Sequence, residues 1–468
     1  MIGRPFSRSR LSLFTLSCLI LAGILGCAAG STKGPNVTDT GNHRGPLLAQ
    51  ASPRGEPGTA RSPQPSRINP IMLGIDVLEA DGFQALRGKR VGLLTHPAGA
   101  NRRGQSTVDV LFEAPQVNLV ALFGPEHGIY GNEKAEIYVA NRTDDRTGLP
   151  VYSLYNENRR PTSDMLKGID TLVIDLQDIG TRSYTYVSSM LYSMASCFES
   201  NVEVVVLDRP NPLGGLKVDG PPLDAQWKSY VGAFRAPYVH GLTIGEIARL
   251  ARYAPGVLRI PRVFDISDEI RERGKLTVIS MRGWNRAMRW PETGLKWVPT
   301  SPAIPDFASA VGYPMTGLGT YLGGFSHGIG KDYLFRGISH PKIPNLKLEQ
   351  ELRALNLPGL DYRRVNVTGI NGKPAWGLYL EITDWAAWNP TELNFHLMHL
   401  ACRYDGENPF AEAANSGKGR GFIVHTGSEA FFDALARDGA KVDIRAWFAK
   451  WKEQALVYQQ QTRRYWLY

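Results

Sequence analysis

The sequence predicts a doubly wound α/β layer, in which parallel strands are covered by helices on both faces. Two observations predict this fold class. Between residues 89 and 281, short runs of aliphatic and β-branched residues alternate with segments of helical periodicity. The strand candidates are apolar throughout rather than at every second position, which is typical of strands buried on both faces. Helices between such strands indicate a parallel sheet.

The predicted elements follow one another along residues 89–281. The first strand candidate is KRVGLLTH at 89–96, and the first helix candidate is STVDVLFEA at 106–114. The helix predicted at 161–169 opens with Pro-Thr-Ser, a helix-start signal. The other candidates are strands at 117–124, 170–178, 202–212 and 275–281, and helices at 183–200 and 242–254.

An export signal precedes this layer. Three arginines stand before the apolar run LSLFTLSCLILAGIL at 11–25, which is too short for a confident membrane span but fits a secretory leader. The run ends in ILGC, which resembles a bacterial lipobox. We therefore expect residues 1–27 to be a lipoprotein signal peptide, with cleavage before Cys27 and lipidation of its thiol. The alternatives are an ordinary signal peptide or an uncleaved anchor.

Export is expected in either case, and two or more acyl chains on Cys27 would anchor the chain stably to a membrane of the cell envelope. Ala28 stands where an aspartate is associated with inner-membrane retention. This favours the periplasmic face of the outer membrane, if the cell has one.

Residues 28–67 are predicted to be a disordered linker, since Gly, Pro, Ser and Thr dominate them and aliphatic runs are almost absent. The first 67 residues hold eight Lys and Arg against two Asp and Glu, and thus carry most of the formal net charge of +9. No nucleic-acid partner is expected for the nearly neutral body. Beyond the leader only Cys197 and Cys402 remain, too few for a disulfide scaffold, and their pairing stays open.

Polar clusters follow four of the predicted strands. Ligands of open parallel sheets bind at the carboxyl ends of the strands, so this edge is the candidate site. The clusters are Thr95 and His96; Glu126 and His127; Asp175, Gln177 and Asp178; and Asp208, Arg209 and Asn211.

Neither a nucleotide cofactor nor a bound metal is expected. The first strand runs into GLLTHPAGANRRG at 92–104 without a G-x-G-x-x-G turn, and G-x-x-x-x-G-K-[ST] does not occur. The nine histidines are scattered, and the pair His396 and His399 lies in a helical run where a structural role is favoured over metal ligation.

Several carboxylates without a metal or a nucleotide suit glycoside hydrolysis. That reaction needs a proton donor at the leaving oxygen and a second carboxylate that attacks the anomeric carbon or activates water. For any single acid here, capping of the following helix or of loop amides is an equally good interpretation.

The chain also resembles a known family, the NamZ-type exo-β-N-acetylmuramidases, long catalogued as a domain of unknown function. The resemblance covers residues 72–468 and is carried by such runs as GLLTHPAG, LFGPEHGIYG, VVLDRPNPLGG, APYVHGLTIGEIARL and TGLKWVPTSPAIP. It implies a Rossmann-like catalytic domain at 72–310, a smaller α+β C-terminal domain at 311–468 and a cleft between them. It also implies release of N-acetylmuramic acid from the non-reducing end of peptidoglycan fragments during cell-wall turnover.

The resemblance implies roles for individual residues. Glu126 corresponds to the glutamate expected to act as acid/base, and His127 would orient it or tune its pKa. Asp175 or Asp178 would be the second carboxylate, acting as nucleophile, base or support for the 2-acetamido group. Substrate-binding candidates in matching motifs are His96, Arg182, Asp208, Arg209, Asn211 and His240. An arginine could clamp the lactyl carboxylate of muramic acid.

The second half departs from the family pattern. His327 stands at the glutamate position of the S-E-G-R-G-T run and Ile329 at its arginine position, while Ala303 replaces the asparagine of S-P-N-x-P. The same stretch holds GFSHG, which matches the nucleophile elbow G-x-S-x-G at Ser326. The elbow requires a strand before the serine and a helix after it, and the glycine-rich sequence predicts neither strongly.

Three function classes follow. The favoured one is a peptidoglycan glycosidase, the second is a non-catalytic glycan-binding lipoprotein, and the third is a serine hydrolase at Ser326. A carboxyl pair about 5 to 9.5 Å apart in one cleft would favour the first class.

Overall fold

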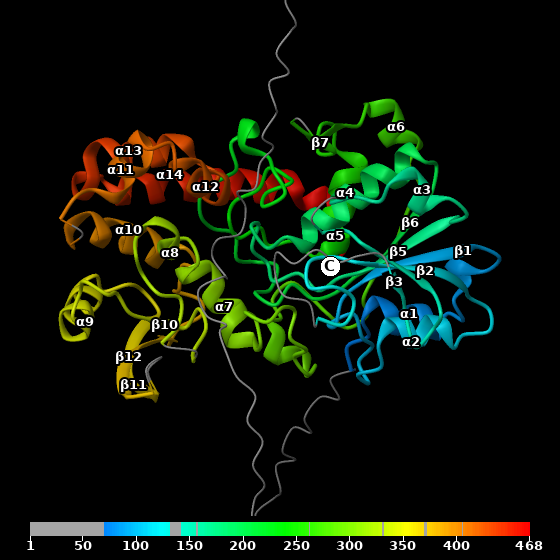
Figure 1. Cartoon of the computed structure of the whole chain (residues 1–468), viewed down its shortest axis with the longest axis horizontal. Coiled ribbons are helices and arrows are strands. Elements are labelled where there is room, and N and C mark those ends of the chain that lie inside the picture. The colour runs from blue at the N-terminus through cyan, green and yellow to red at the C-terminus, as the bar shows by residue number, and fades with distance from the viewer. Residues whose placement is uncertain are drawn as a thin grey trace, which may run out of the picture. The chain divides into compact units, whose positions relative to one another are not determined.

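A mostly parallel sheet of seven strands forms the centre of the N-terminal half of the described chain, on the right in Figure 1. Every neighbouring pair is parallel except the antiparallel edge pair β3–β4. In spatial order the strands are β3 (Arg142–Thr143), β4 (Pro150–Ser153), β2 (Asn118–Gly124), β1 (Arg90–Thr95), β5 (Thr171–Asp175), β6 (Glu203–Leu207) and β9 (Leu276–Ile279).

The computed structural model describes residues 70–131, 142–155, 158–261, 263–329, 332–368, 372–404 and 406–468. Pro70–Tyr468 forms one compact unit. The predicted signal peptide at 1–27, with Cys27, and the predicted linker at 28–67 lie outside the described residues. No helix within the described ranges is both long and apolar enough to cross a membrane.

All five predicted strands are present, as β1, β2, β5, β6 and β9. The predicted helices are present as α2 (Thr107–Phe112), α3 (Ser163–Leu166), α4 (Tyr186–Glu199) and α5 (Ile244–Tyr253). The short strands β3 and β4 escaped prediction because two and four residues carry too little periodicity. The other elements of this half are α1 (Gly74–Ala80), β7 (Arg259–Ile260), β8 (Phe264–Asp265), α6 (Asp268–Arg273) and the 3-10 helices η1 (Gln84–Leu86), η2 (Ala225–Trp227) and η3 (Trp290–Thr293).

Helices cover both faces of the sheet, which confirms the doubly wound class. Figure 1 shows α4 and α5 on one face and α1 and α2 on the other. Successive strand residues alternate between two cores: Ile174 packs in the core that contains α4 and α5, and Val173 in the core that contains α1 and α2. Both residues are fully buried, as expected for a strand covered on both sides.

The chain order places a switch point between β1 and β5. From β1 the chain moves to β2 and β4 on one side, and β5, β6 and β9 extend the sheet on the other. The connections therefore leave the carboxyl ends of β1 and β5 in opposite directions. A crevice for a ligand is expected at such a point.

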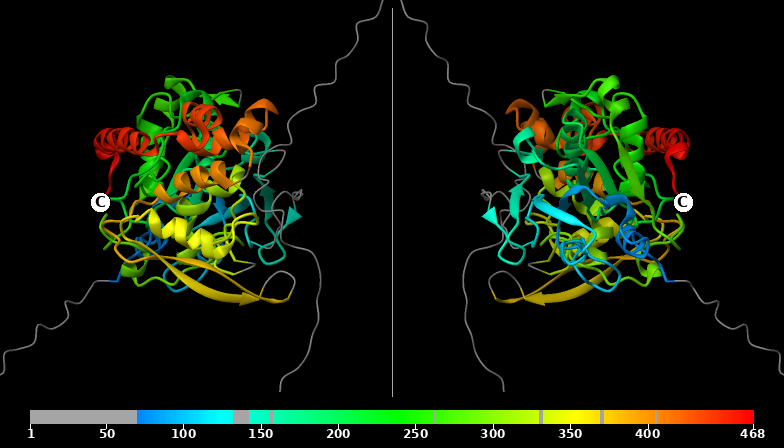
Figure 2. Two further views of the ribbon diagram at one scale, coloured as in Figure 1. Left: turned by 90° about the vertical axis from the view of Figure 1, so that its left-hand side faces the viewer. Right: turned by 90° about the vertical axis from the view of Figure 1, so that its right-hand side faces the viewer.

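The C-terminal region is α+β, as the resemblance implied. The strands β11 (Leu360–Thr368) and β12 (Pro374–Ile382) form a long hairpin to which β10 (Gly337–Ile338) adds a third antiparallel strand (Figure 2). The helices are α7 (Phe307–Thr316), α8 (Gly319–Leu322), α9 (Asn345–Ala354), α10 (Glu392–Tyr404), α11 (Pro409–Asn415), α12 (Gly419–Thr426), α13 (Glu429–Asp438) and α14 (Ile444–Thr462), with η4 (Gly439–Lys441) and η5 (Arg463–Tyr465).

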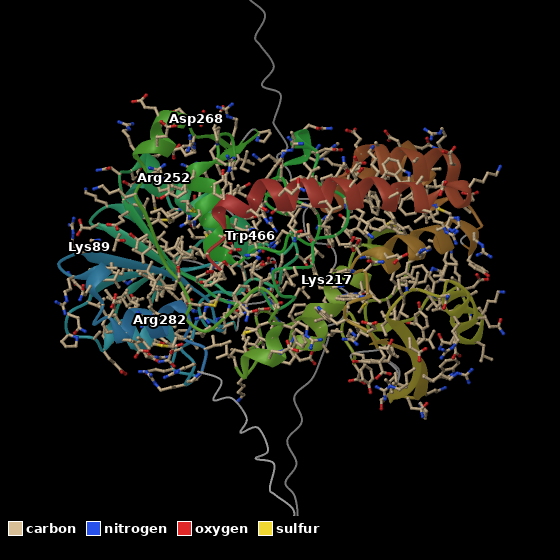
Figure 3. The ribbon with its side chains drawn as sticks, turned by 180° about the vertical axis from the view of Figure 1, so that it is seen from behind. Lys89, Lys217, Arg252, Asp268, Arg282 and Trp466 are labelled. Carbon is tan, nitrogen blue, oxygen red and sulfur yellow. The ribbon has the colours of Figure 1, made fainter. Side chains whose placement is uncertain are left out.

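The end of the chain returns to the α/β layer after α14 (Figure 3). The Tyr468 hydroxyl donates a hydrogen bond to Asp208 Oδ2 at 2.7 Å, and the Arg286 guanidinium lies 3.7 Å from the centroid of the Trp466 ring. The last residues of the chain thus pack beside the end of β6. They join the C-terminal region to the α/β layer.

Candidate active site

Glu126 and His127 occupy a tight turn directly after β2. The Gly128 N–H donates to the Pro125 carbonyl at 2.9 Å, which closes the turn, and His127 has a φ of 72°. The left-handed region at this third turn position favours glycine or asparagine. A histidine held there stores backbone strain, a feature that clusters at functional sites.

Glu126 is oriented by the N-terminus of α4. The Thr185 hydroxyl donates to Glu126 Oε2 at 3.3 Å. Both Glu126 and His127 are more than nine-tenths buried, with exposed fractions of 8% and 7%. A carboxyl with so little solvent contact and one fixed donor has a defined direction.

Glu126 and His127 line a pocket that we call the Glu126 pocket. Its walls come from the carboxyl edge of the sheet and from the C-terminal region, so both halves of the chain build it. The lining residues are Glu126, His127, Ser183, Tyr184, Thr185, Tyr186, Val231, Tyr238, Ser301, Ala303, Ile304, Tyr313, Gly317, Leu318, Phe335 and His425.

Aromatic side chains dominate the walls of the Glu126 pocket. The Tyr313 ring from α7 makes edge contacts with Tyr184 and Phe335, at centroid distances of 6.0 and 5.0 Å. Ser183 Oγ lies 2.8 Å from the Tyr238 hydroxyl and 3.2 Å from that of Tyr313. Burial raises the pKa of Tyr184 and Tyr238 well above the usual range, so their hydroxyls stay neutral. Apolar walls with a few directed polar groups are typical of ligand sites.

Asp175 does not line the Glu126 pocket. It is fully buried at the end of β5 and pairs with Arg209, whose Nε and Nη2 donate to its two oxygens at 2.5 and 2.8 Å. The Thr107 hydroxyl from α2 donates to it as well. Its acceptor capacity is therefore used by three structural donors, and its contacts are those of an ion pair that joins β5 and β6.

Asp178 also lies outside the lining of the Glu126 pocket, in a buried pair with His240. Asp178 Oδ2 accepts the Gly180 N–H at 2.7 Å and lies 3.1 Å from His240 Nε2. Because His240 Nδ1 accepts the Leu242 N–H at 3.2 Å, the ring proton sits on Nε2 and points at Asp178. Of the described residues that line the Glu126 pocket, Glu126 is the only carboxylate. Asp178 Oδ1 is buried without a hydrogen-bond partner among the described residues, so one oxygen of this carboxylate is not held by the protein. Convergence of Glu126 with one of the two aspartates stays a prediction.

The predicted arginines also make structural contacts. Arg182 is 1% exposed, and its guanidinium donates to four backbone carbonyls, those of Pro221, Ala236, His425 and Thr426. It thereby ties α12 to the α/β layer and does not reach the Glu126 pocket. Arg209 is held by Asp175 and the Ala100 carbonyl.

The other predicted binding residues, Asp208, Asn211 and His96, form hydrogen bonds within the protein at this edge of the sheet. Asp208 accepts four hydrogen bonds, from Thr243, Tyr468 and two backbone N–H groups, and Asn211 spans the Leu242 carbonyl and the Leu213 N–H. His96 Nε2 accepts the Gln177 N–H at 2.9 Å, and its ring meets Tyr186 at 4.5 Å. Burial, with the Arg209 charge, lowers the His96 pKa to about 3 and keeps the ring neutral.

The divergent second-half residues lie at or near the same pocket. Ala303 lines it, and the His327 ring lies 4.8 Å from that of Phe335, which lines it too. Burial lowers the His327 pKa. Ile329 is buried against Gly337 and Gly377.

Ser326 is bridged to Ser339 through backbone atoms between α8 and β10, so it follows a helix rather than a strand. The strand-to-helix context of a nucleophile elbow is missing there. His396 and His399 lie in α10 as predicted, and the His399 ring contacts the Ala440 carbonyl. Among the described residues, no group of three or more His, Cys, Asp or Glu could hold a metal ion.

Sequence reasoning missed much of the pocket wall. Ser183 to Tyr186 begin eight residues after the end of β5, and a search for aromatic and hydroxyl residues just beyond the strand ends could have found them. Tyr313, Phe335 and His425 carry no local signal, because only the tertiary packing brings them to Glu126.

The chain is similar to proteins of known sequence and structure. The chain is 40% identical over 342 residues to the peptidoglycan β-N-acetylmuramidase NamZ of Bacillus subtilis, which covers 72% of this chain and 77% of the relative. Crystal structures of two DUF1343 family proteins from Bacteroides fragilis are also similar. The first has a TM-score of 0.73 and is 37% identical, and the match covers 85% of this chain and 99% of the crystal structure's chain. The second has a TM-score of 0.58 and is 26% identical, and the match covers 86% of this chain and 99% of that chain.

Two family models match almost the whole described unit. The model for the N-terminal part of the exo-β-N-acetylmuramidase NamZ matches residues 91–308, and the model for its C-terminal part matches residues 311–468. The chain belongs to the NamZ family of exo-β-N-acetylmuramidases.

Proposed function

We propose that this protein is an exo-acting glycosidase that releases N-acetylmuramic acid from the non-reducing end of peptidoglycan fragments. The observation that carries the proposal is the position of Glu126. Among the described residues it is the single carboxylate lining the Glu126 pocket, on a strained turn at the carboxyl edge of the sheet, in a chain of the NamZ family.

Glu126 would act as the general acid. Its carboxyl proton passes to the glycosidic oxygen as the bond from that oxygen to the anomeric carbon breaks, and positive charge develops on the sugar ring. Thr185 fixes the direction of the carboxyl group, and His127, its neighbour in the turn, would position it. With one carboxylate among the described lining residues, the second reacting group would come from the substrate's own 2-acetamido oxygen or from water.

Release of a chromophore from a synthetic N-acetylmuramide tests the proposal. The chain from residue 68 onward is suitable because it contains the whole compact unit Pro70–Tyr468. We expect muramide-selective release, with the matching N-acetylglucosaminide as control, and a loss of at least 1,000-fold in the Glu126→Gln variant. Unaltered release by Glu126→Gln would contradict the role of Glu126.

A non-catalytic glycan-binding protein is the second candidate, and the altered residues His327, Ile329 and Ala303 favour it. Such a protein would bind muramyl fragments with an unchanged affinity in the Glu126→Gln variant and release no chromophore. The same assay therefore separates the two functions.

We also propose export and lipid anchoring through Cys27, on the strength of the leader pattern ILGC. Radiolabelled palmitate fed to expressing cells should label the full chain and leave the Cys27→Ala variant unlabelled. Equal labelling of both would remove the anchor from the proposal.

A further inference from the structure

A second pocket lies at the switch point of the sheet, and we call it the switch-point pocket. Its lining comes from the loop after β1, from Gln177 after β5, from Arg209 after β6 and from the segment that holds Trp290 and Lys296. Its volume is about 180 Å³, against the roughly 30 Å³ of one water molecule. It can therefore hold a small polar group rather than a single water. No residue is shared with the Glu126 pocket.

The charge of this lining is one-sided. Of the described residues that line the switch-point pocket, four are cations and none is a carboxylate; the cations are Arg102, Arg103, Arg209 and Lys296. Two of them have acidic partners, since Arg209 pairs with Asp175 and Arg103 with Glu79. Arg102 and Lys296 are exposed, and neither forms a salt bridge within the described part of the chain. The buried carboxylate of Asp76 accepts the Arg102 backbone N–H at 3.1 Å and interacts with the Arg102 charge.

Two buried polar atoms belong to residues that line the same pocket. Gln177 Nε2 donates to the carbonyls of Asp178 and Pro210, at 2.7 and 2.9 Å, which fixes the amide and leaves Oε1 without a partner. The Trp290 indole N–H also has no partner among the described residues. Gln177 is 2% and Trp290 7% exposed. Buried polar atoms usually have partners, so one unpaired acceptor and one unpaired donor point to a ligand.

The two pockets differ in the charge of the described residues that line them. Of the described residues that line the Glu126 pocket, none is a lysine or an arginine. A substrate with an acidic side group would find no cationic partner among these lining residues. The two pockets are neighbours, because His96 Nε2 accepts the N–H of Gln177, which lines the switch-point pocket, and the His96 ring makes an edge contact with Tyr186, which lines the Glu126 pocket.

We propose that the switch-point pocket binds an anionic group, a carboxylate or a phosphate, that stands beside an O–H or N–H donor. Arg102, Lys296 and the Trp290 indole N–H bind the anion, and Gln177 Oε1 accepts the neighbouring donor. Under the proposed function, on which this identification of the source rests, the anion is the acid side group of the muramyl glycan. A free small acid has the same chemistry and is the other source.

The Trp290 indole N–H provides a readout that is independent of activity. In a ¹⁵N-labelled chain from residue 68 onward, N-acetylmuramic acid and inorganic phosphate should each shift the Trp290 indole resonance saturably, and N-acetylglucosamine, which lacks a carboxylate, should not. Trp290→Phe assigns the resonance. Absence of any shift with both anions would overturn the proposal.

A double variant and a matched control test the cations. Arg102→Gln/Lys296→Gln should weaken both titrations at least ten-fold, since it removes the two lining cations that form no salt bridge among the described residues. Arg87→Gln/Lys275→Gln makes the same change in net charge at exposed positions before β1 and β9, at the opposite edge of the sheet, and should leave both titrations unchanged. Equal weakening in both double variants would mean that only the overall charge matters and would overturn the proposal.

Kinetics separate the two sources of the anion. If the pocket holds the acid group of the substrate, the Arg102/Lys296 double variant raises KM for the muramide, and phosphate inhibits competitively. If it holds a separate acid, phosphate binds without changing KM. A chain that hydrolyses the muramide but gives no Trp290 shift would refute this inference alone. A chain that binds phosphate here but hydrolyses nothing would refute the proposed function alone.

Discussion

The Thr185 hydroxyl lies at the N-cap position of α4 but donates to Glu126 Oε2, at 3.3 Å, and accepts no backbone N–H of its own helix. Two other helices in this half of the chain have a side-chain cap at the N-terminus. The Thr162 hydroxyl accepts the Met165 N–H of α3, and the Thr243 hydroxyl accepts the Glu246 N–H of α5. A cap hydrogen bond stabilises a helix by about 1 kcal/mol. The N-terminus of α4 has no such side-chain cap, because the Thr185 hydroxyl donates to the Glu126 carboxylate instead.

Removal of this donor should impair the chemical step more than substrate binding. Thr185→Val keeps the shape of the side chain and deletes the hydroxyl, so we expect kcat for the muramide to fall about ten-fold with KM nearly unchanged. Thr185→Ser should restore most of the rate. Steady-state kinetics of the three proteins measure this.

Thr162→Val is the matched control, because Thr162 caps α3 and does not line the Glu126 pocket. It should lower the free energy of unfolding by about 1 kcal/mol and leave kcat unchanged. If Thr185→Val behaves in the same way as this control, Thr185 does not position Glu126.

Asp175 should prove to be a structural residue. Its pair with Arg209 is almost fully buried, with exposed fractions of 0% and 3%, so Asp175→Asn leaves an uncompensated guanidinium inside the protein. We expect the free energy of unfolding to fall by about 3–5 kcal/mol, as measured by urea denaturation.

The control for this change lies at the other end of β5, next to the start of β1. Asp170 also pairs with an arginine, Arg90, but both side chains are about half exposed, and water screens the pair. Asp170→Asn should therefore change stability far less. If Asp175→Asn keeps its stability and loses activity instead, Asp175 takes part in the reaction.

The sequence predicts the edge of the sheet where the site lies, because apolar strands and the polar residues that end them are local patterns. It does not show which of those side chains enter a pocket. Asp175 and Glu126 both end parallel strands, but Thr107 and Arg209 hold Asp175 in the interior, and only the turn after β2 presents Glu126 to the Glu126 pocket. That difference depends on contacts with α2 and β6 that lie far apart in the sequence.

The residues that the C-terminal region contributes to the Glu126 pocket could not be predicted from the sequence, for a related reason. Tyr313, Phe335 and His425 come from three separate elements or loops of the C-terminal region and reach the Glu126 pocket only through packing between the two halves. Arg182 illustrates the same dependence. Its motif suggested a substrate clamp, but its guanidinium is used by carbonyls that the C-terminal region supplies from more than 240 residues away.

Asp208 should make stability fall as the pH rises. Burial, and then the charge of Glu246, raise its pKa to about 7 in the folded chain, against about 4 when unfolded. Between these values the folded state binds more protons than the unfolded state. The contribution of Asp208 to stability is therefore fully present below pH 4 and is lost as the pH rises to about 7.

Asp208→Asn should flatten this dependence. The amide oxygen can still accept the two backbone N–H groups, and its nitrogen can donate to the hydroxyls of Thr243 and Tyr468. Denaturation at pH 5 and pH 7.5 should show a smaller loss of stability in the variant than in the parent chain. An equal loss in both would mean that Asp208 is ionised throughout this range.

The identity of the second reacting group gives the last prediction. Within the described part of the chain, Glu126 is the only carboxylate that lines the Glu126 pocket; Asp175 pairs with Arg209 and Asp178 Oδ2 with His240. With no second carboxylate in the lining, we expect the 2-acetamido oxygen of the substrate to attack the anomeric carbon, as in substrate-assisted glycosidases. Replacement of the acetyl group by trifluoroacetyl withdraws electron density from that oxygen, so kcat should fall by at least ten-fold. A rate independent of fluorination would instead indicate that water or an aspartate attacks, and Asp178→Asn would then separate these two, because only an attacking aspartate makes the reaction sensitive to that change.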